Sequence, residues 1–236
     1  MTSDAALTLT TAMMAAAFIQ QSLEHLSPAA RPAERRLFAL RLLLSVLLFA
    51  GSIGIAGPDP RLLTVALVAL HLLILPFFNG PYNGGADRMS LLLLLCVTAA
   101  WIAPAARWRD LALGYLGMQL LLSYFLSGWV KVVNAEWRNG GALRDVFLFS
   151  AYPAGENIRR WADRPGVLRW ASWSVIGLEL LFPLAFLSRP TLIAALAIAA
   201  LFHAANACLF GLNRFFWIWI CAYPSILWLQ GRVIGG

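Results

Sequence analysis

Long apolar stretches separated by short polar connections dominate the chain. Seven of them are long enough for helices that cross a hydrocarbon core of about 30 Å, which takes about 20 residues. An eighth stretch, residues 5–23, is uncharged but rich in Thr, Ala and Gln, so it either spans the membrane or lies flat in its interface. The pattern predicts an all-α, polytopic transmembrane helical bundle with seven to eight spans. The seven predicted spans cover residues 37–56, 61–79, 89–106, 111–133, 171–188, 190–210 and 214–231.

Two segments are predicted from this pattern. Residues 1–36 are expected to hold the marginal N-terminal helix and a basic linker, and residues 37–236 the membrane bundle. Within the bundle, the connection 134–170 alternates Arg with aromatic residues such as Trp161 and Trp170, which is typical of amphipathic interfacial helices. We interpret it as a belt on anionic headgroups, and the alternative is a lid over a site formed by the neighbouring spans.

Composition agrees with a membrane location. The chain is 61% hydrophobic and only 12% charged, which excludes soluble enzyme folds, nucleic-acid-binding modules and disordered tails. The net charge of +7 then reflects arginines in loops, because basic loops tend to stay cytoplasmic. Most of these arginines fall on the face that holds the 134–170 connection, so we expect that face to be cytoplasmic in a bacterial inner membrane. No basic region precedes the first apolar stretch, so no removable signal peptide is expected.

The three cysteines give no indication of a metal site. Cys96, Cys208 and Cys221 lie in apolar runs and show neither CxxC nor CxxH spacing. We interpret them as small core residues and predict neither a metal site nor a redox pair.

Lys131 is the single lysine among the eighteen basic residues. Arginine keeps its proton at accessible pH, whereas a partly desolvated lysine can act as a neutral base. Lys131 lies near the end of an apolar stretch, where its amine either faces the bundle interior or snorkels to the interface. Tyr124, Ser127 and Gly128 precede it at helical spacing, so we expect one stripe to carry a phenol, a hydroxyl, a small gap and the amine.

Glu179 is the only carboxylate well inside a predicted span. Pro183 lies four residues later and removes the hydrogen bond to the carbonyl of Glu179, so a local kink is favoured. A buried acid needs a partner, and Lys131, His203 or a water are candidates. A purely structural acid satisfied by neighbouring helices is the alternative.

Other polar residues in the apolar stretches are weaker candidates. His203 and Asn206 share one helical face, although a lone histidine in an apolar helix is usually a satisfied core residue. Asp87, beside Arg88, is either a paired site residue or an ordinary cap at a helix start. His71 has no polar neighbour at helical spacing, and we expect it in the core.

Several of these residues lie in segments that resemble a known family. YFLSGWVKVVNAEWRNGGAL, from Tyr124 to Leu143, and FHAANACLFGLNRFF, from Phe202 to Phe216, are similar to the HTTM domain. This domain is the membrane portion shared by the vitamin K-dependent gamma-glutamyl carboxylases and many shorter bacterial relatives. Glu179 with Pro183 adds to the resemblance, and NGGADRMSLLLLL adds a weaker match.

The resemblance implies a chemistry. In the carboxylases, reduced vitamin K is oxygenated to a strong base that removes the gamma proton of a peptide glutamate, and a neutral lysine starts this sequence by deprotonating the hydroquinone. Lys131 falls where that lysine would lie. A quinone or quinol is therefore the candidate cofactor, although the substrate cannot be identified. We expect three catalytic residues, Lys131, His203 and Glu179, and four substrate-binding or cofactor-binding residues, Tyr124, Asn206, Trp129 and Asp87.

Two functions follow from these observations. The first is an enzyme that uses a lysine-centred polar pocket for quinol-linked proton abstraction on a hydrophobic substrate. Peptide carboxylation itself is not expected, because the chain has no large extramembrane domain to hold a peptide. The second is a non-catalytic transmembrane subunit or assembly factor of a larger respiratory or photosynthetic complex, which the ten tryptophans suit equally well. In either case the partners are the bilayer and other hydrophobic molecules or membrane proteins, not nucleic acid.

Overall fold

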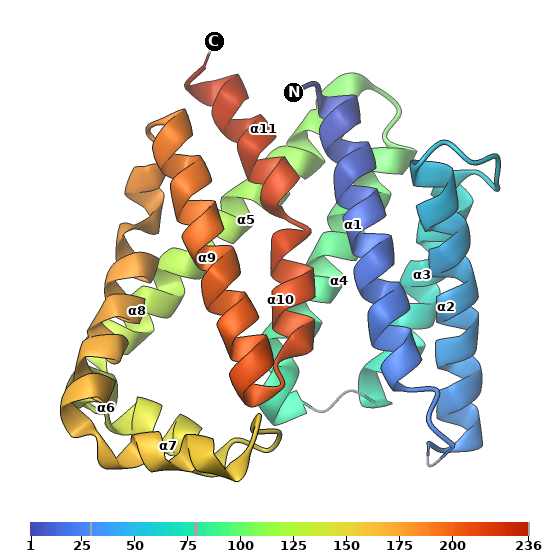
Figure 1. Cartoon of the computed structure of the whole chain (residues 1–236). Coiled ribbons are helices and arrows are strands. Elements are labelled where there is room, and N and C mark those ends of the chain that lie inside the picture. Colours follow the sequence, from blue (N-terminus) through green and yellow to red (C-terminus); the bar gives the residue numbers. More distant parts are fainter. Residues whose placement is uncertain (29, 78–79, 236) are drawn as a thin grey trace. The chain divides into compact units, whose positions relative to one another are not determined.

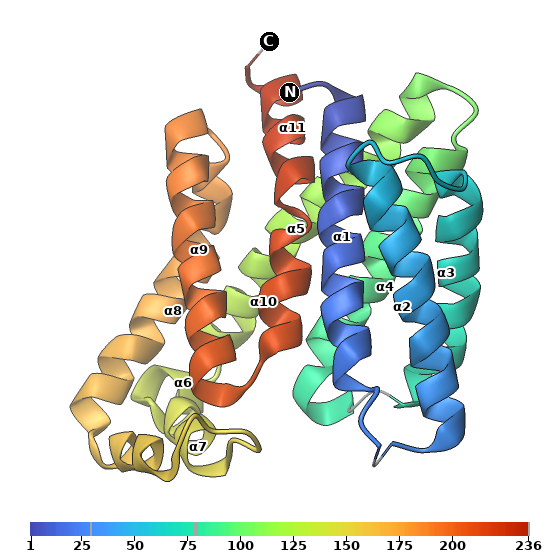
Figure 2. The same ribbon diagram turned by 45° about the vertical axis from the view of Figure 1, so that its right-hand side comes forward.

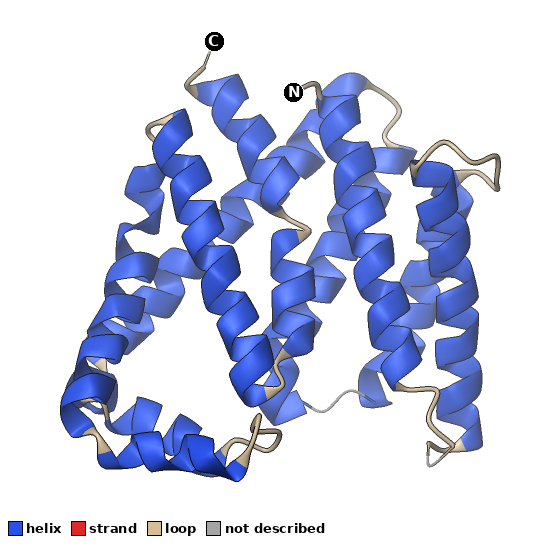
Figure 3. Cartoon of the chain, viewed as in Figure 1, coloured by secondary structure: helices blue, strands red, loops and turns tan. Residues whose placement is uncertain are grey.

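All regular elements in the described part of the chain are helical (Figure 3), which confirms the predicted all-α class. The computed structural model describes residues 1–28, 30–77 and 80–235, without the side chains of residues 80–83. Within these ranges it has eleven α-helices and two 3₁₀ segments. They are α1 (Ser3–Glu24), α2 (Pro32–Ser52), α3 (Pro60–Ile74), η1 (Leu75–Phe77), α4 (Gly80–Ile102), α5 (Ala106–Val133), α6 (Ala135–Asn139), α7 (Gly141–Phe149), η2 (Glu156–Asp163), α8 (Pro165–Ala185), α9 (Arg189–Phe210), α10 (Asn213–Ile220) and α11 (Tyr223–Val233).

Six helices of the described residues are long and apolar enough to cross a membrane, close to the seven to eight predicted. The marginal N-terminal stretch is among them as α1. Helix α2 has sufficient length but carries Arg35, Arg36 and Arg41, so its composition falls short of that of a span. The six candidate spans are Ser3–Glu24, Pro60–Phe77, Gly84–Ile102, Ala106–Val133, Pro165–Ala185 and Arg189–Phe210.

The predicted span 214–231 is interrupted. Helix α10 ends at Ile220 and α11 begins at Tyr223. Pro224 explains the break, because its ring clashes with the carbonyl four residues earlier, which is that of Ile220. Each of the two resulting helices is shorter than the roughly 20 residues that a span requires.

The chain divides into two compact units. Unit 1 comprises Met1–Gly117 and Trp217–Gly231, and unit 2 comprises Met118–Phe216 and Arg232–Gly236. In unit 1, helices α1 to α4 run side by side (Figures 1 and 2). Helix α11 also packs against the unit 1 part of α5, where a Cβ on Gly117 would lie only 3.1 Å from the carbonyl oxygen of Ser225.

The interior of unit 1 contains a buried cation that the sequence analysis did not weigh. The Arg41 side chain is fully buried, and its guanidinium lies 3.9 Å from the centroid of the Phe18 ring. His71, which is also fully buried, stacks on the same ring at 5.8 Å. Phe18 thereby joins helices α1, α2 and α3, because a desolvated guanidinium gains from the face of an aromatic ring.

Replacing Phe18 by leucine removes the aromatic face while keeping an apolar side chain. We expect this Phe18→Leu change to lower the free energy of unfolding by about 1–2 kcal/mol, because the buried guanidinium loses its ring contact. Thermal unfolding in detergent measures it. Phe149→Leu is the matched control, since the Phe149 side chain is 72% exposed and its replacement should leave the unfolding temperature unchanged.

In unit 2, the segment that follows α5 forms a platform, a name we use for residues 135–163, which hold α6, α7 and η2. Figure 2 shows α6 and α7 running across the ends of α8 and α9 rather than along them. The Phe147 ring packs edge-on against Phe210 of α9, and the amide of Ala154 donates to the carbonyl of Leu209 at 2.9 Å. The platform is therefore fixed to the end of α9.

Arg159 holds the platform together internally. Its Nε donates to Glu156 Oε2 at 2.6 Å, and its Nη1 donates to the carbonyl of Leu148 in α7. The hydrogen bond and the charge of Arg159 lower the pKa of the exposed Glu156 below its ordinary value. One guanidinium thus connects η2 with the helix that precedes it.

Candidate functional site

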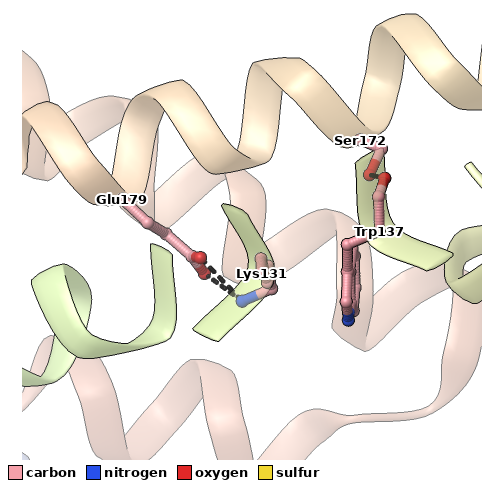
Figure 4. Close-up of polar contacts among 4 residues, drawn as sticks. All are labelled: Lys131, Trp137, Ser172 and Glu179. Carbon is pink, nitrogen blue, oxygen red and sulfur yellow. Dashed lines mark hydrogen bonds and ion pairs between the residues drawn. The ribbon is translucent and has the colours of Figure 1, made fainter. Parts of the chain in front are cut away.

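The single lysine forms an ion pair inside unit 2. Lys131 lies in the last turn of α5, and its Nζ donates to Oε1 and Oε2 of Glu179 on α8 at 2.9 and 2.6 Å (Figure 4). The side chains are 17% and 6% exposed. Glu179 is therefore paired with Lys131, which is one of its three predicted partners. Two opposite charges withdrawn from water are stable only when they are paired and hydrogen-bonded in this way.

Gly128 makes this pairing sterically accessible. It lies almost one turn before Lys131, and a Cβ at this position would come within 2.7 Å of the backbone nitrogen of Leu180. Helices α5 and α8 therefore meet backbone to backbone beside Glu179, which confirms the predicted small gap. Ser127, which was expected on the same stripe, is instead exposed.

We expect Gly128→Ala to separate α5 from α8, because the nearest contacted atom, the backbone nitrogen of Leu180, cannot move aside. Lengthening of the ion pair should follow, with destabilisation of about 1–3 kcal/mol from overpacking. Thermal unfolding of the purified chain measures the loss. Gly177→Ala on α8 is the matched control, because nothing lies within 4 Å of a Cβ there and the change should be neutral or stabilising.

Trp137 lies beside the ion pair, and Ser172 is hydrogen-bonded to Trp137. The Trp137 ring centroid lies 5.1 Å from Lys131 Nζ, and Ser172 Oγ of α8 donates to the Trp137 carbonyl (Figure 4). Trp173 Nε1 likewise donates to the carbonyl of Arg138 at 3.2 Å. Sequence reasoning missed these contacts, because they depend on the chain changing direction after α5 and returning over the lysine.

A second polar pair links α5 with α9. Tyr124 Oη and His203 Nε2 are 3.0 Å apart, and both side chains are buried, at 3% and 6% exposure. The Tyr124 ring stacks on Phe182 of α8 at 4.1 Å. Tyr124 precedes Lys131 by two helical turns, roughly 10 Å along α5. Both pairs use a side chain of α5, and we refer to them together as the polar region of unit 2.

Three other residues of the predicted site have different surroundings. Asn206 donates to the carbonyl of Phe202 in its own helix at 2.9 Å. Trp129 is 53% exposed and stacks on Phe125. Asp87 is buried in unit 1, seven residues after the start of α4, so its interpretation as a helix-start cap is wrong.

The cysteines differ in their exposure. Cys96 and Cys221 are buried, whereas Cys208 is exposed on α9, so the core prediction is wrong for that residue. Among the described residues, no group of three His, Cys, Asp or Glu side chains is arranged to hold a metal ion. The two polar pairs bring together an amine with a carboxylate and a phenol with an imidazole.

The ion pair can be measured by a double-mutant cycle. Lys131→Met leaves the Glu179 carboxylate buried without its cation, which we expect to cost about 3–5 kcal/mol of unfolding free energy. Adding Glu179→Leu should restore most of that loss, because no unpaired charge then remains. Additive losses in the two single variants and the double variant would contradict the pairing.

Comparison with known proteins places part of the chain in a family. A model described as the HTTM domain matches residues 98–229. The matched range contains Tyr124, Lys131, Glu179 and His203 and excludes α1 to α3. No curated protein and no solved structure matches the chain.

Proposed function

The chain belongs to the HTTM domain family and is an integral membrane protein, and from this premise we propose that it is an enzyme that removes a proton from a hydroxyl group of a hydrophobic, quinol-like substrate. The observation that carries the proposal is the Lys131–Glu179 pair. The single lysine of the chain is held by two hydrogen bonds against a carboxylate that is almost completely buried.

The pair can accept one proton without an isolated charge appearing in the bundle. Lys131 passes its hydrogen-bonded proton to Glu179, which leaves a neutral amine and a neutral acid. The amine then takes the proton of the substrate hydroxyl and becomes an ammonium again. The products are protonated Glu179 and a substrate oxyanion paired with Lys131, so protons and charges balance. The Trp137 ring limits access of water to the amine.

Tyr124 and His203 extend the polar region along α5, from the end that carries Lys131 toward the middle of the helix. A quinol has two oxygens at opposite ends of its ring, and a second hydrogen-bonding group is needed to orient it. The phenol of Tyr124 and the imidazole of His203 supply such groups if their mutual hydrogen bond is exchanged for one to the substrate. We assign Tyr124 and His203 to substrate binding on this basis, and His203 can also exchange a proton with the bound substrate.

A hydrophobic substrate fits the surroundings of the pair. Residues that flank it on α5 and α8 are apolar and exposed, including Val130, Leu181 and Leu184, each at about 60% exposure. In an integral membrane protein such side chains face lipid. A substrate dissolved in the bilayer can therefore reach the helices that carry the pair. We propose the inner membrane of a bacterium as that bilayer, with the arginine-rich 134–170 connection on the cytoplasmic face.

Lys131→Arg tests the proposal, because arginine keeps the ion pair but cannot supply a neutral base. A reduced naphthoquinone is added anaerobically to the reconstituted chain, and formation of its oxyanion is followed by ultraviolet absorption. We expect the unaltered chain to form the oxyanion at neutral pH and Lys131→Arg to do so roughly 10²–10⁴-fold more slowly.

The control is an arginine-to-lysine replacement outside the proposed site. Arg232 is exposed, and Arg232→Lys should leave oxyanion formation unchanged. A folded Lys131→Arg variant that reacts as fast as the unaltered chain would contradict the base function. In that case the ion pair acts only as a brace between α5 and α8, and the chain is better explained as a subunit that co-purifies in fixed ratio with other membrane proteins.

A further inference from the structure

The platform is tethered to the membrane surface at both ends. It follows α5, which ends at Val133, and precedes α8, which begins at Pro165, and both helices are candidate spans. The two ends therefore emerge on the same side of the bilayer. A chain of short helices with both ends fixed at this surface remains at the depth of the lipid headgroups.

Exposed guanidinium groups follow one another along the platform and into α8. Arg144 on α7, Arg160 on η2, Arg164 between η2 and α8, and Arg169 on α8 are all exposed. We call these four residues the arginine set. Nearby acids are Glu136, Asp145, Glu156 and Asp163, of which Glu156 already pairs with Arg159. Guanidinium forks match phosphate oxygens in geometry as well as in charge.

Large aromatic side chains are interleaved with the arginine set. Trp170 is 79% exposed, and Arg164 lies over the Trp161 ring at 5.2 Å. Tryptophan and tyrosine prefer the boundary between headgroups and acyl chains, where the ring is in an apolar medium and its polar atom is hydrated. The exposed aromatic side chains of this region are Phe149, Tyr152, Trp161, Trp170 and Trp173.

The arginine set is presented on a fixed scaffold. Leu168, Ala162 and Ile158 point inward and are almost fully buried, so the outward positions are left to Arg and Trp. Gly140, at φ +90°, turns α6 into α7 so tightly that a Cβ there would lie 2.9 Å from the backbone nitrogen of Arg169. Because the cations are held in place before a ligand arrives, little conformational entropy is lost on binding.

From these observations we infer that the platform and the first turns of α8 form a binding surface for the phosphate headgroups of acidic phospholipids. A lipid fits better than an acidic protein, because the surface lies at headgroup depth and combines cations with aromatic side chains. This inference does not rest on the proposed function. It assigns the arginine set to the headgroups and the exposed aromatic side chains to the acyl boundary.

Lipid binding to the intact full chain can be counted by mass spectrometry of the protein released from detergent with phosphatidylglycerol or phosphatidylcholine present. We expect the unaltered chain to prefer phosphatidylglycerol by at least about tenfold. Replacing all four arginines of the set by glutamine should abolish the preference. The matched control replaces four other exposed arginines, Arg61, Arg107, Arg189 and Arg232, by glutamine, and it should retain the preference at the same net charge.

Equal loss of preference in both quadruple variants would overturn the inference, since binding would then follow net charge alone. Replacing the arginine set by lysine guards against misfolding of the glutamine variant, and this charge-conserving variant should keep most of the preference. If the unaltered chain shows no preference for phosphatidylglycerol but binds soluble polyglutamate, the surface serves an acidic protein and the lipid assignment is wrong.

Discussion

The packing of unit 2 depends on one constraint, which is that a charged side chain withdrawn from water needs a partner of opposite charge. A lysine and a glutamate withdrawn into a helical bundle must meet, and they meet only if their helices come close. Gly128 allows that approach, and Ser172 and Trp137 fix the returning chain over the pair. Glycine, ion pair and platform therefore depend on one another, and the contacts among α5, α6 and α8 follow from a single electrostatic requirement.

The sequence was sufficient for the helical class, and it reduced the partners of Glu179 to Lys131, His203 or a water. Apolar length determines where spans form, but the choice among those three partners depends on how the helices pack, which one sequence does not give. Two local features also bear on the spans: Pro224 terminates the preceding helix at Ile220, and Arg41 interrupts an apolar run. Both could have corrected the predicted spans 214–231 and 37–56.

Other features could not be read from one sequence. The contact of Trp137 with Lys131 depends on a change of chain direction within a few residues. Helical spacing predicts neighbours only within one helix, so it does not predict contacts between residues on either side of such a turn. His71 illustrates the same limit. Its neighbours along the helix are apolar, yet the Phe18 ring reaches it from another helix and also contacts Arg41. Periodicity within one helix predicts which face is buried, but not which side chains of other helices meet that face.

The Arg41 contact has a consequence for biosynthesis. Helix α2 is a poor candidate for partitioning into lipid alone, because a guanidinium at the middle of a span is costly to transfer. The Phe18 ring that shields it belongs to α1, which precedes it in the chain. Synthesis from the N-terminus therefore delivers the aromatic ring before the cation that needs it. The ring is thus already in the chain when α2 forms, and packing of α2 against α1 covers the guanidinium with an aromatic face.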